Sequence, residues 1–229
     1  MLTIKQYGLP RSGTNFMKDV LLKNWNVSVD TDISNSKHAQ WFPTGMPSIA
    51  VVKNPYAWLV SVYRRFADPA LEDQNPFFIE EDFPTYLCTR FVARYRQKDI
   101  IREYRSANPI QHWNDYNWHY LSVMDWSDEM LVVKYEDMLD PLNAEVALGS
   151  FMERWGAEST SDTLKLPVKE VVPGSGNDYK DRTTYGEGNF DTGYYIQAKY
   201  MKQFTPELVA FVSQELDHDL MGRLGYDLI

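Results

Sequence analysis

The feature that most constrains the fold is a short apolar stretch that runs directly into a glycine-bearing turn. Residues 2–7 read Leu-Thr-Ile-Lys-Gln-Tyr, and Gly8-Leu-Pro-Arg-Ser-Gly-Thr-Asn15 follows at once. Gly8 and Gly13 allow the backbone to turn tightly, and a helical pattern then begins at Thr14. Backbone N–H groups at a helix start lie at the positive end of the helix dipole. The turn would present those of Ser12, Gly13, Thr14 and Asn15. A strand, a glycine turn and a helix N-terminus together predict a site for phosphate or sulfate.

The spacing of the two glycines matches the first part of a nucleotide P-loop, G-x-x-x-x-G. The Lys-Ser/Thr pair that completes that motif is missing, because Thr14-Asn15 stands in its place. A different cation, Arg11, lies inside the turn. A nucleotide kinase or NTPase of the P-loop type is therefore an alternative hypothesis, and a strand-to-helix turn without a ligand is another.

Two further apolar runs, residues 49–52 and 130–133, have the length and composition of buried strands. Helical patterns lie between and after them, and strands that alternate with helices predict an α/β fold with a parallel central sheet flanked by helices. The length of 229 residues fits one domain, residues 1–229. In such sheets ligands bind beyond the carboxyl ends of the strands. The predicted helices cover residues 14–22, 56–66, 83–105, 110–124, 141–155 and 206–216.

The second run leads into another arrangement that suits an anion. Lys53 follows the strand, and Asn54 and Pro55 form a typical helix start. Ser61 lies on the same face of the predicted helix as Asn54, because residues three and four apart are neighbours. A cation and a hydroxyl beside a helix N-terminus predict a second phosphate site, with an N-capped helix and a solvated lysine as the alternative.

Together the two motifs resemble those of the sulfotransferases that use 3′-phosphoadenosine 5′-phosphosulfate (PAPS). That family has a Pro-Lys/Arg-Ser-Gly-Thr loop for the 5′-phosphosulfate, and an Arg followed eight residues later by a Ser for the 3′-phosphate. Lys53 and Ser61 have that spacing here. Lys134-Tyr-Glu-Asp-Met138 and Leu224-Gly-Tyr-Asp-Leu228 are also similar to family segments. The resemblance implies a P-loop NTPase-like sulfotransferase fold, with PAPS as co-substrate and no metal.

The chain departs from the family pattern at two points. Lys53 replaces the usual Arg, which keeps the charge but gives up bidentate phosphate recognition. The Arg-Lys-Gly triplet of the cytosolic members is absent, and Lys180 and Arg182 are the nearest substitutes for its contacts to the 3′-phosphate.

The resemblance also implies roles for single residues. Arg11 would stabilise the oxygen that bridges phosphate and sulfate, and Tyr135 would stack on adenine, although a core tyrosine is the structural alternative. The family places its base in the interval that contains His38, so His38 is the predicted general base, with Lys37 as a nearby cation. The other histidines are predicted to pack or to line an acceptor cleft (His112 and His119) or to lie at the surface (His218).

Composition excludes several other classes of protein. The formal net charge of −9 and the pI near 4.9 argue against a general nucleic-acid binder. The single cysteine, Cys88, and the absence of zinc-ligand spacing leave no disulfide or metal motif. No apolar run reaches 18 residues and no signal peptide is visible, so we expect a soluble, cytoplasmic enzyme. Its acceptor would be a small molecule or a carbohydrate. A non-catalytic protein of the same nucleotide-binding fold is the third hypothesis, and the oligomeric state stays open.

Overall fold

Four parallel strands form the centre of the protein. The computed structural model describes residues 1–30, 45–67, 79–97, 100–167 and 192–229. The strand order in the central sheet is β2-β1-β3-β6. These strands are β1 (Leu2–Gly8), β2 (Val27–Asp30), β3 (Ser48–Val52) and β6 (Met130–Lys134). The predicted α/β class is thus confirmed, and the three predicted strands are present within one residue of the expected bounds.

The register of the sheet brings three strand ends to one edge. Gly8 of β1 pairs with Val51 of β3, and Val52 pairs with Lys134 of β6. After β1 the chain crosses to β2 on one side of it, and it then crosses back to β3 on the other side. The region beyond the carboxyl ends of β1 and β3 is therefore a topological switch point, where ligands bind in open α/β sheets.

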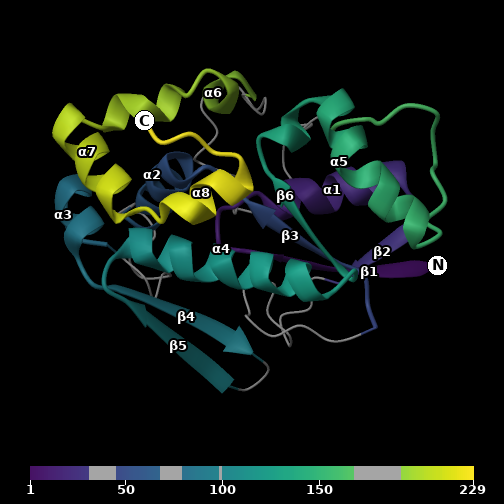
Figure 1. Cartoon of the computed structure of the whole chain (residues 1–229), viewed down its shortest axis with the longest axis horizontal. Coiled ribbons are helices and arrows are strands. Elements are labelled where there is room, and N and C mark those ends of the chain that lie inside the picture. Colours follow the sequence, from purple (N-terminus) through teal and green to yellow (C-terminus); the bar gives the residue numbers. More distant parts are fainter. Residues whose placement is uncertain (31–44, 68–78, 98–99, 168–191) are drawn as a thin grey trace, which may run out of the picture.

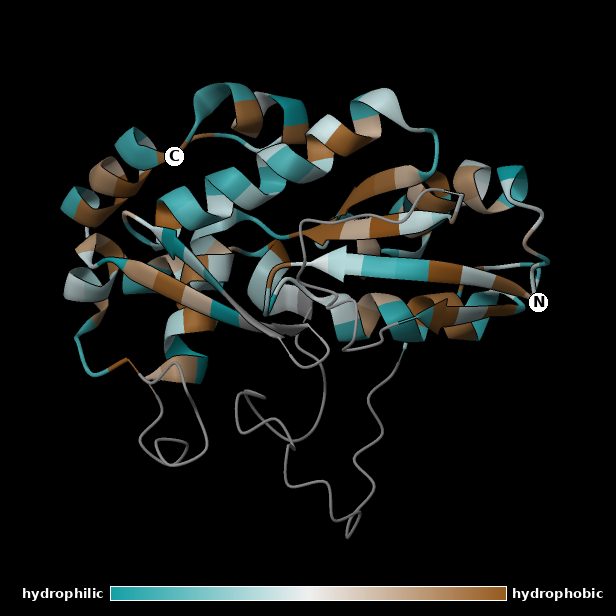
Figure 2. Cartoon of the chain, turned by 90° about the horizontal axis from the view of Figure 1, so that it is seen from below, coloured by the Kyte–Doolittle hydropathy of each residue, from teal (hydrophilic) through white to brown (hydrophobic). Residues whose placement is uncertain are grey.

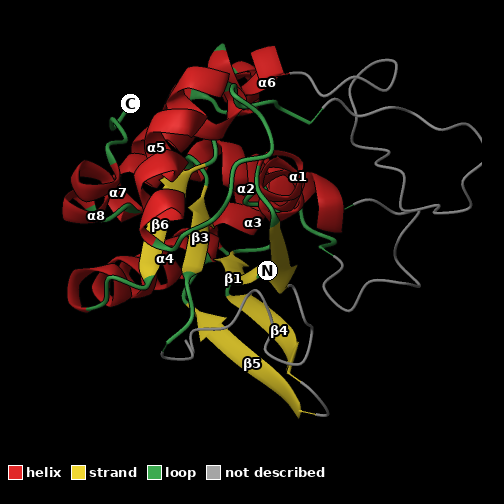
Figure 3. Ribbon diagram, turned by 90° about the vertical axis from the view of Figure 1, so that its right-hand side faces the viewer, coloured by secondary structure: helices red, strands yellow, loops and turns green. Residues whose placement is uncertain are grey.

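Helices cover both faces of the sheet (Figures 1 and 3). Tyr7, Ala50 and Val52 pack into a cluster with α2 (Pro55–Phe66), α4 (Pro109–Trp126) and α8 (His218–Leu224). The alternate strand residues, such as Ile49 and Val51, face the opposite side of the sheet. There they pack with α1 (Thr14–Asn24) and α5 (Pro141–Arg154). This alternation is the period of two of a β-strand, and both of its phases are apolar because neither face of the sheet meets water.

The middle of β1 carries polar side chains although the strand is buried on both faces. Figure 2 shows this hydrophilic stretch within the strand. Lys5 is 1% exposed, and its ammonium donates to the Asp30 carboxylate on β2 at 2.9 Å. The buried side-chain amide of Gln6 donates to the carbonyl of Thr14. Gln6 thereby fixes the start of α1 against the strand that precedes the loop.

The prediction of one helix over residues 83–105 is wrong. The helix α3 (Phe83–Cys88) is short, and an antiparallel hairpin follows it, formed by β4 (Phe91–Gln97) and β5 (Ile100–Ser106). The aromatics Phe91 and Tyr95 are four residues apart, which imitates a helical face. The actual period is two, since Ala93 is buried and Arg94, beside it, is exposed. Figures 1 and 3 show the hairpin projecting from the body of the molecule.

The remaining helices begin and end close to the predicted positions. Asn54, Asn108, Asp140 and Thr205 cap α2, α4, α5 and α7 (Pro206–Glu215) through their side chains, and a proline follows each of them. Such caps stabilise a helix start because they pair backbone N–H groups that have no partner within the helix. The elements without a counterpart in the prediction are β2, η3 (Asp137–Leu139), α6 (Thr192–Ile196), η4 (Lys199–Gln203) and α8.

His112 of α4 packs between the hairpin and α2, as expected for a packing residue. Its ring lies 6.4 Å from that of Trp58 and 4.9 Å from that of Phe91, and its Nδ1 is 3.1 Å from the hydroxyl of Ser106. Burial lowers the pKa of His112 to about 3. The imidazole is therefore neutral in the folded protein at neutral pH.

The His112 pKa predicts a loss of stability in acid. The unfolded chain takes up a proton near pH 6.5, whereas the folded chain does not, so the contribution is complete above pH 6.5 and falls as the pH drops toward 3. At pH 5 the loss is about 2 kcal/mol. Urea unfolding of the wild type and of His112→Asn at pH 7 and 5 measures it. The variant should lose about 2 kcal/mol less between the two pH values, and an unchanged pH dependence would contradict the assignment. His218→Asn, at an exposed position, is the control.

Candidate anion site at the strand ends

The loop between β1 and α1 uses three backbone conformations that favour glycine. Gly8 has φ 152°, and a Cβ there would lie 2.5 Å from Ser12 Oγ and 2.8 Å from the carbonyl oxygen of Val51. Gly13 has φ 103°, and a Cβ there would overlap the ring of Tyr135. Arg11, which is not a glycine, has φ 69°. A non-glycine residue in the left-handed region costs about 1–2 kcal/mol, so the fold holds Arg11 there against its preference.

Ser12 contributes to the loop in a different way from the one predicted. Its backbone N–H donates to the carbonyl of Leu9 at 3.0 Å, so this N–H closes a turn and is not available to a ligand. Its side-chain oxygen is buried and has no hydrogen-bond partner among the residues that the structure describes. No side chain caps α1, whose N-cap is Gly13. A buried hydroxyl at an uncapped helix start suits an anionic oxygen.

Lys53 lies at the end of β3, as predicted, and it is buried rather than solvated. Its exposure is 4%, and its ammonium lies 4.1 Å from the ring centroid of Tyr135 and 4.6 Å from that of Tyr195. Two aromatic faces stabilise a cation that has lost most of its water. The alternative of a solvated lysine is therefore wrong. The two rings hold the ammonium of Lys53 at the end of β3.

The two predicted motifs contact each other. The Arg11 Nε donates to the Ser61 hydroxyl at 3.4 Å, which joins the loop after β1 to the helix after β3. One turn earlier on α2, the indole Nε1 of Trp58 donates to the carbonyl of Pro10 at 2.8 Å. Asn54 caps the helix, since its side chain accepts from the N–H groups of Tyr56 and Ala57. The structure thus brings Arg11 and Ser61 together, 50 residues apart in sequence.

Tyr135 stands between the two motifs. It follows β6, is 2% exposed, and packs edge-on against Phe16 and Tyr195. The ring fills the position that a Cβ on Gly13 would occupy, and the ammonium of Lys53 lies over the face of the ring. Tyr135 is therefore a core residue, as the structural alternative predicted, and its stacking on adenine stays a prediction.

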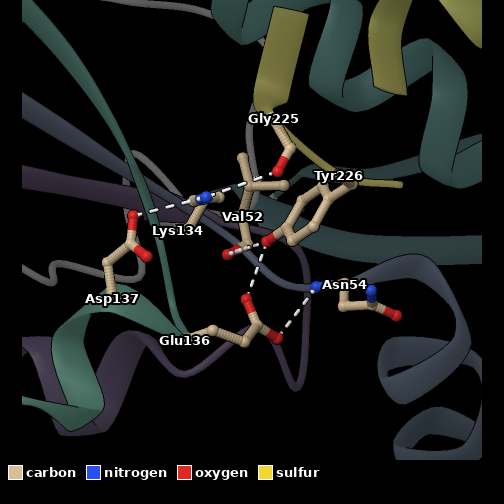
Figure 4. A network of polar contacts seen from close by, with 7 residues as sticks. All are labelled: Val52, Asn54, Lys134, Glu136, Asp137, Gly225 and Tyr226. Carbon is tan, nitrogen blue, oxygen red and sulfur yellow. Dashed lines mark hydrogen bonds and ion pairs between the residues drawn. The ribbon is translucent and has the colours of Figure 1, made fainter. Parts of the chain in front are cut away.

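Figure 4 shows a network of polar contacts that connects the C-terminal segment with the same edge of the sheet. The Tyr226 hydroxyl donates to Glu136 at 2.7 Å, and the other carboxylate oxygen of Glu136 accepts from the Asn54 N–H at 3.1 Å. Nearby, the Lys134 ammonium lies 3.6 Å from the Asp137 carboxylate and 3.4 Å from the Gly225 carbonyl. The segments Lys134–Met138 and Leu224–Leu228, identified separately in the sequence, are therefore neighbours.

The carboxylate of Glu136 interacts electrostatically with the ammonium of Lys53. Burial raises the pKa of Glu136, while the hydrogen bonds from Tyr226 and Asn54 and the charge of Lys53 act in the opposite direction. Burial and the same carboxylate raise the pKa of Tyr226. Sequence reasoning assigned no role to Glu136 or Tyr226, and the only available signal was that each belongs to a short motif.

The other predicted site residues are distributed as follows. Thr14 and Asn15 form the first turn of α1, and Thr14 is buried whereas Asn15 is exposed. His119 is half-buried on α4 and His218 is exposed, as expected for a surface position. Four predicted residues lie outside the described part of the chain, namely Lys37, His38, Lys180 and Arg182. Their roles stay predictions.

Comparisons with protein-family models, with curated proteins and with solved structures found no match for this chain. Within the described ranges, no helix has the length and apolarity needed to cross a membrane. The same residues include no cluster of three or more His, Cys, Asp or Glu side chains that would hold a metal ion. The case for a function therefore rests on the geometry of the strand ends.

The Tyr226–Glu136 contact predicts a specific loss of stability. Tyr226→Phe removes a hydrogen bond to the half-buried carboxylate of Glu136, which should lower the free energy of unfolding by about 1–3 kcal/mol. Tyr86→Phe is the matched control, because the buried Tyr86 hydroxyl has no hydrogen-bond partner among the described residues. Its loss should change stability by less than about 0.5 kcal/mol. Urea unfolding at neutral pH measures both, and equal effects would show that the C-terminal contact contributes nothing.

Proposed function

We propose that the protein is a PAPS-dependent sulfotransferase, which transfers a sulfuryl group to a hydroxyl or amine acceptor. The observation that carries the proposal is the contact between Arg11 and Ser61, which joins two strand-to-helix junctions at a topological switch point. PAPS has negative charge at two positions of one adenosine, so it requires two anion sites within the length of a nucleotide. The buried Lys53, whose ammonium lies 4.1 Å from the ring centroid of Tyr135, supplies a second cation at the same edge of the sheet.

The described residues fit such a ligand. The buried Ser12 hydroxyl, Arg11 and the uncapped start of α1 would hold the phosphosulfate. Lys53 and Ser61 would hold the 3′-phosphate, with Ser61 exchanging its contact with Arg11 for one with the ligand. Charge-assisted hydrogen bonds of this kind contribute about 1.5–3 kcal/mol each. In a chain of net charge −9, affinity for this anion would come from these local groups.

PAPS supplies the sulfuryl group: a bond forms between its sulfur and the acceptor oxygen, and the bond from sulfur to the 5′-phosphate oxygen breaks. Arg11 and the positive end of the α1 dipole would neutralise the charge that develops on the departing oxygen. The acceptor proton would pass to the predicted base His38, which a neutral imidazole permits near pH 7. Lys37 would offer a further cation to the sulfuryl oxygens.

Thermal unfolding with nucleotides tests the two anion sites. Adenosine 3′,5′-bisphosphate at 100 times its dissociation constant should add about 2.7 kcal/mol without magnesium, which raises the midpoint by several degrees. Lys53→Met should abolish that shift, since it removes the charge and keeps the apolar stem. Lys202→Met removes the same charge at an exposed position of η4 that is not one of the candidate site residues, and it should leave the shift intact. A larger shift with ATP and magnesium would instead favour the P-loop kinase or NTPase hypothesis.

Two substitutions separate binding from transfer, with labelled PAPS and a panel of acceptors as the assay. His38→Ala should preserve bisphosphate binding and reduce transfer by about 10²–10⁴-fold, the usual contribution of a general base. Arg11→Ala should weaken both. His218→Ala, at an exposed position on α8, should behave as the wild type. Unchanged turnover in His38→Ala would exclude this histidine as the base, and absence of transfer by the wild type to any acceptor would favour the non-catalytic hypothesis.

A further inference from the structure

A cavity of about 490 Å³ adjoins the loop after β1. Pro10 of the loop lines it, and so do Trp58 and Val62, from a face of α2 next to the one that carries Ser61. The carbonyl of Pro10 accepts from Trp58, and Arg11, the next residue, reaches Ser61. The cavity therefore adjoins the residue that precedes Arg11. Its volume falls within the range of small-molecule sites, about 300–1,000 Å³.

Aromatic side chains are among the residues that line the cavity wall. Trp58, Tyr86 and Phe91 line it, and the ring of Phe91 packs edge-on against the other two at centroid distances of 6.3 Å. The hydroxyl of Tyr86 is buried without a hydrogen-bond partner among the described residues. Flat apolar rings pack well on such a wall.

Five charged side chains also line the cavity, with an excess of cations. Three arginines and two glutamates contribute, which gives 3 − 2 = +1 in a chain of net charge −9. The carboxylate of Glu103 accepts from the Nε atoms of both Arg94 and Arg105, and these hydrogen bonds lower the pKa of Glu103. Arg90 is exposed and has no ion pair with any described residue. Its guanidinium is thus available to an anionic ligand. The five charged residues are Arg90, Arg94, Arg105, Glu81 and Glu103.

We infer that this cavity binds an aromatic hydroxy acid: a flat ring against the partly exposed Phe91, with an acidic group at Arg90. This inference rests on the proposed function for one step only, namely that the ring hydroxyl is the group that receives the sulfuryl group. Pro10 lines the cavity and directly precedes Arg11, so the proposed acceptor site adjoins the candidate anion site. The binding of the acid itself depends only on the cavity.

Isothermal titration calorimetry on the full chain tests the binding with three probes of one size. They are a hydroxynaphthoate, its carboxamide and its aminomethyl counterpart, which carry negative, zero and positive charge. The acid should bind about tenfold or more tightly than the carboxamide, as a charge-assisted hydrogen bond provides, and the amine should bind more weakly than either. Arg90→Glu should remove the advantage of the acid and leave the carboxamide within about twofold.

Arg154→Glu is the matched control, because it makes the same charge change at an exposed site of α5. It should leave the binding of all three probes as in the wild type. The inference is overturned if no probe binds, if the acid and the carboxamide bind equally, or if both arginine variants weaken the acid to the same degree. These outcomes do not depend on nucleotide.

The same sample, titrated separately with adenosine 3′,5′-bisphosphate, tests the proposed function on its own. Binding of the acid without any binding of the bisphosphate would keep the cavity assignment and discard the sulfotransferase. Binding of the bisphosphate without any binding of the acid would do the reverse. Where both bind, transfer from labelled PAPS to the hydroxynaphthoate should fall at least about tenfold in kcat/KM in Arg90→Glu. A wild-type rate in that variant would overturn the acceptor role.

Discussion

The contact on which the site depends is the one between the ring of Tyr135 and its two neighbours. Gly13 approaches one part of the ring so closely that only a residue without a Cβ fits, and Lys53 places its charge 4.1 Å above the ring centroid. The three residues follow β1, β3 and β6, which end at one edge of the sheet. One buried aromatic side chain thus sets the separation between an uncapped helix start and a buried cation. If the ring moved, both candidate anion sites would change together.

The C-terminal segment is tied to the same place by a different kind of interaction. Glu136, the residue after Tyr135, accepts hydrogen bonds from Tyr226 and from the N–H of Asn54, which is the cap of α2. These donors offset the loss of water around the half-buried carboxylate. The cap of α2, the turn after β6 and the end of the chain therefore form one connected unit. Through Asn54, this unit fixes the start of α2, the helix that carries Ser61.

Sequence reasoning predicted the part of the fold in which local signals agree. Each of α2, α5 and α7 has a capping residue followed by proline, and the three main strands have apolar runs that end in turn residues. It failed at residues 83–105, where aromatics four apart imitate a helix although Ala93 and Arg94 alternate between interior and solvent. It placed Lys53 correctly at a strand end but left a solvated lysine open as the alternative, because nothing local shows that Tyr135 and Tyr195 enclose it. Contacts between residues 50 or more apart, such as Arg11 with Ser61 or Glu136 with Tyr226, have no local signal at all.

The left-handed backbone conformation of Arg11 affects which residues evolution would favour at this position. A glycine at this position would relax the peptide and raise stability, yet it would delete the guanidinium that spans the two junctions. Selection for robustness and selection for anion recognition therefore pull this position in opposite directions. Persistence of a long cationic side chain on such a backbone is what a binding role would maintain, whereas a purely architectural turn would drift toward glycine.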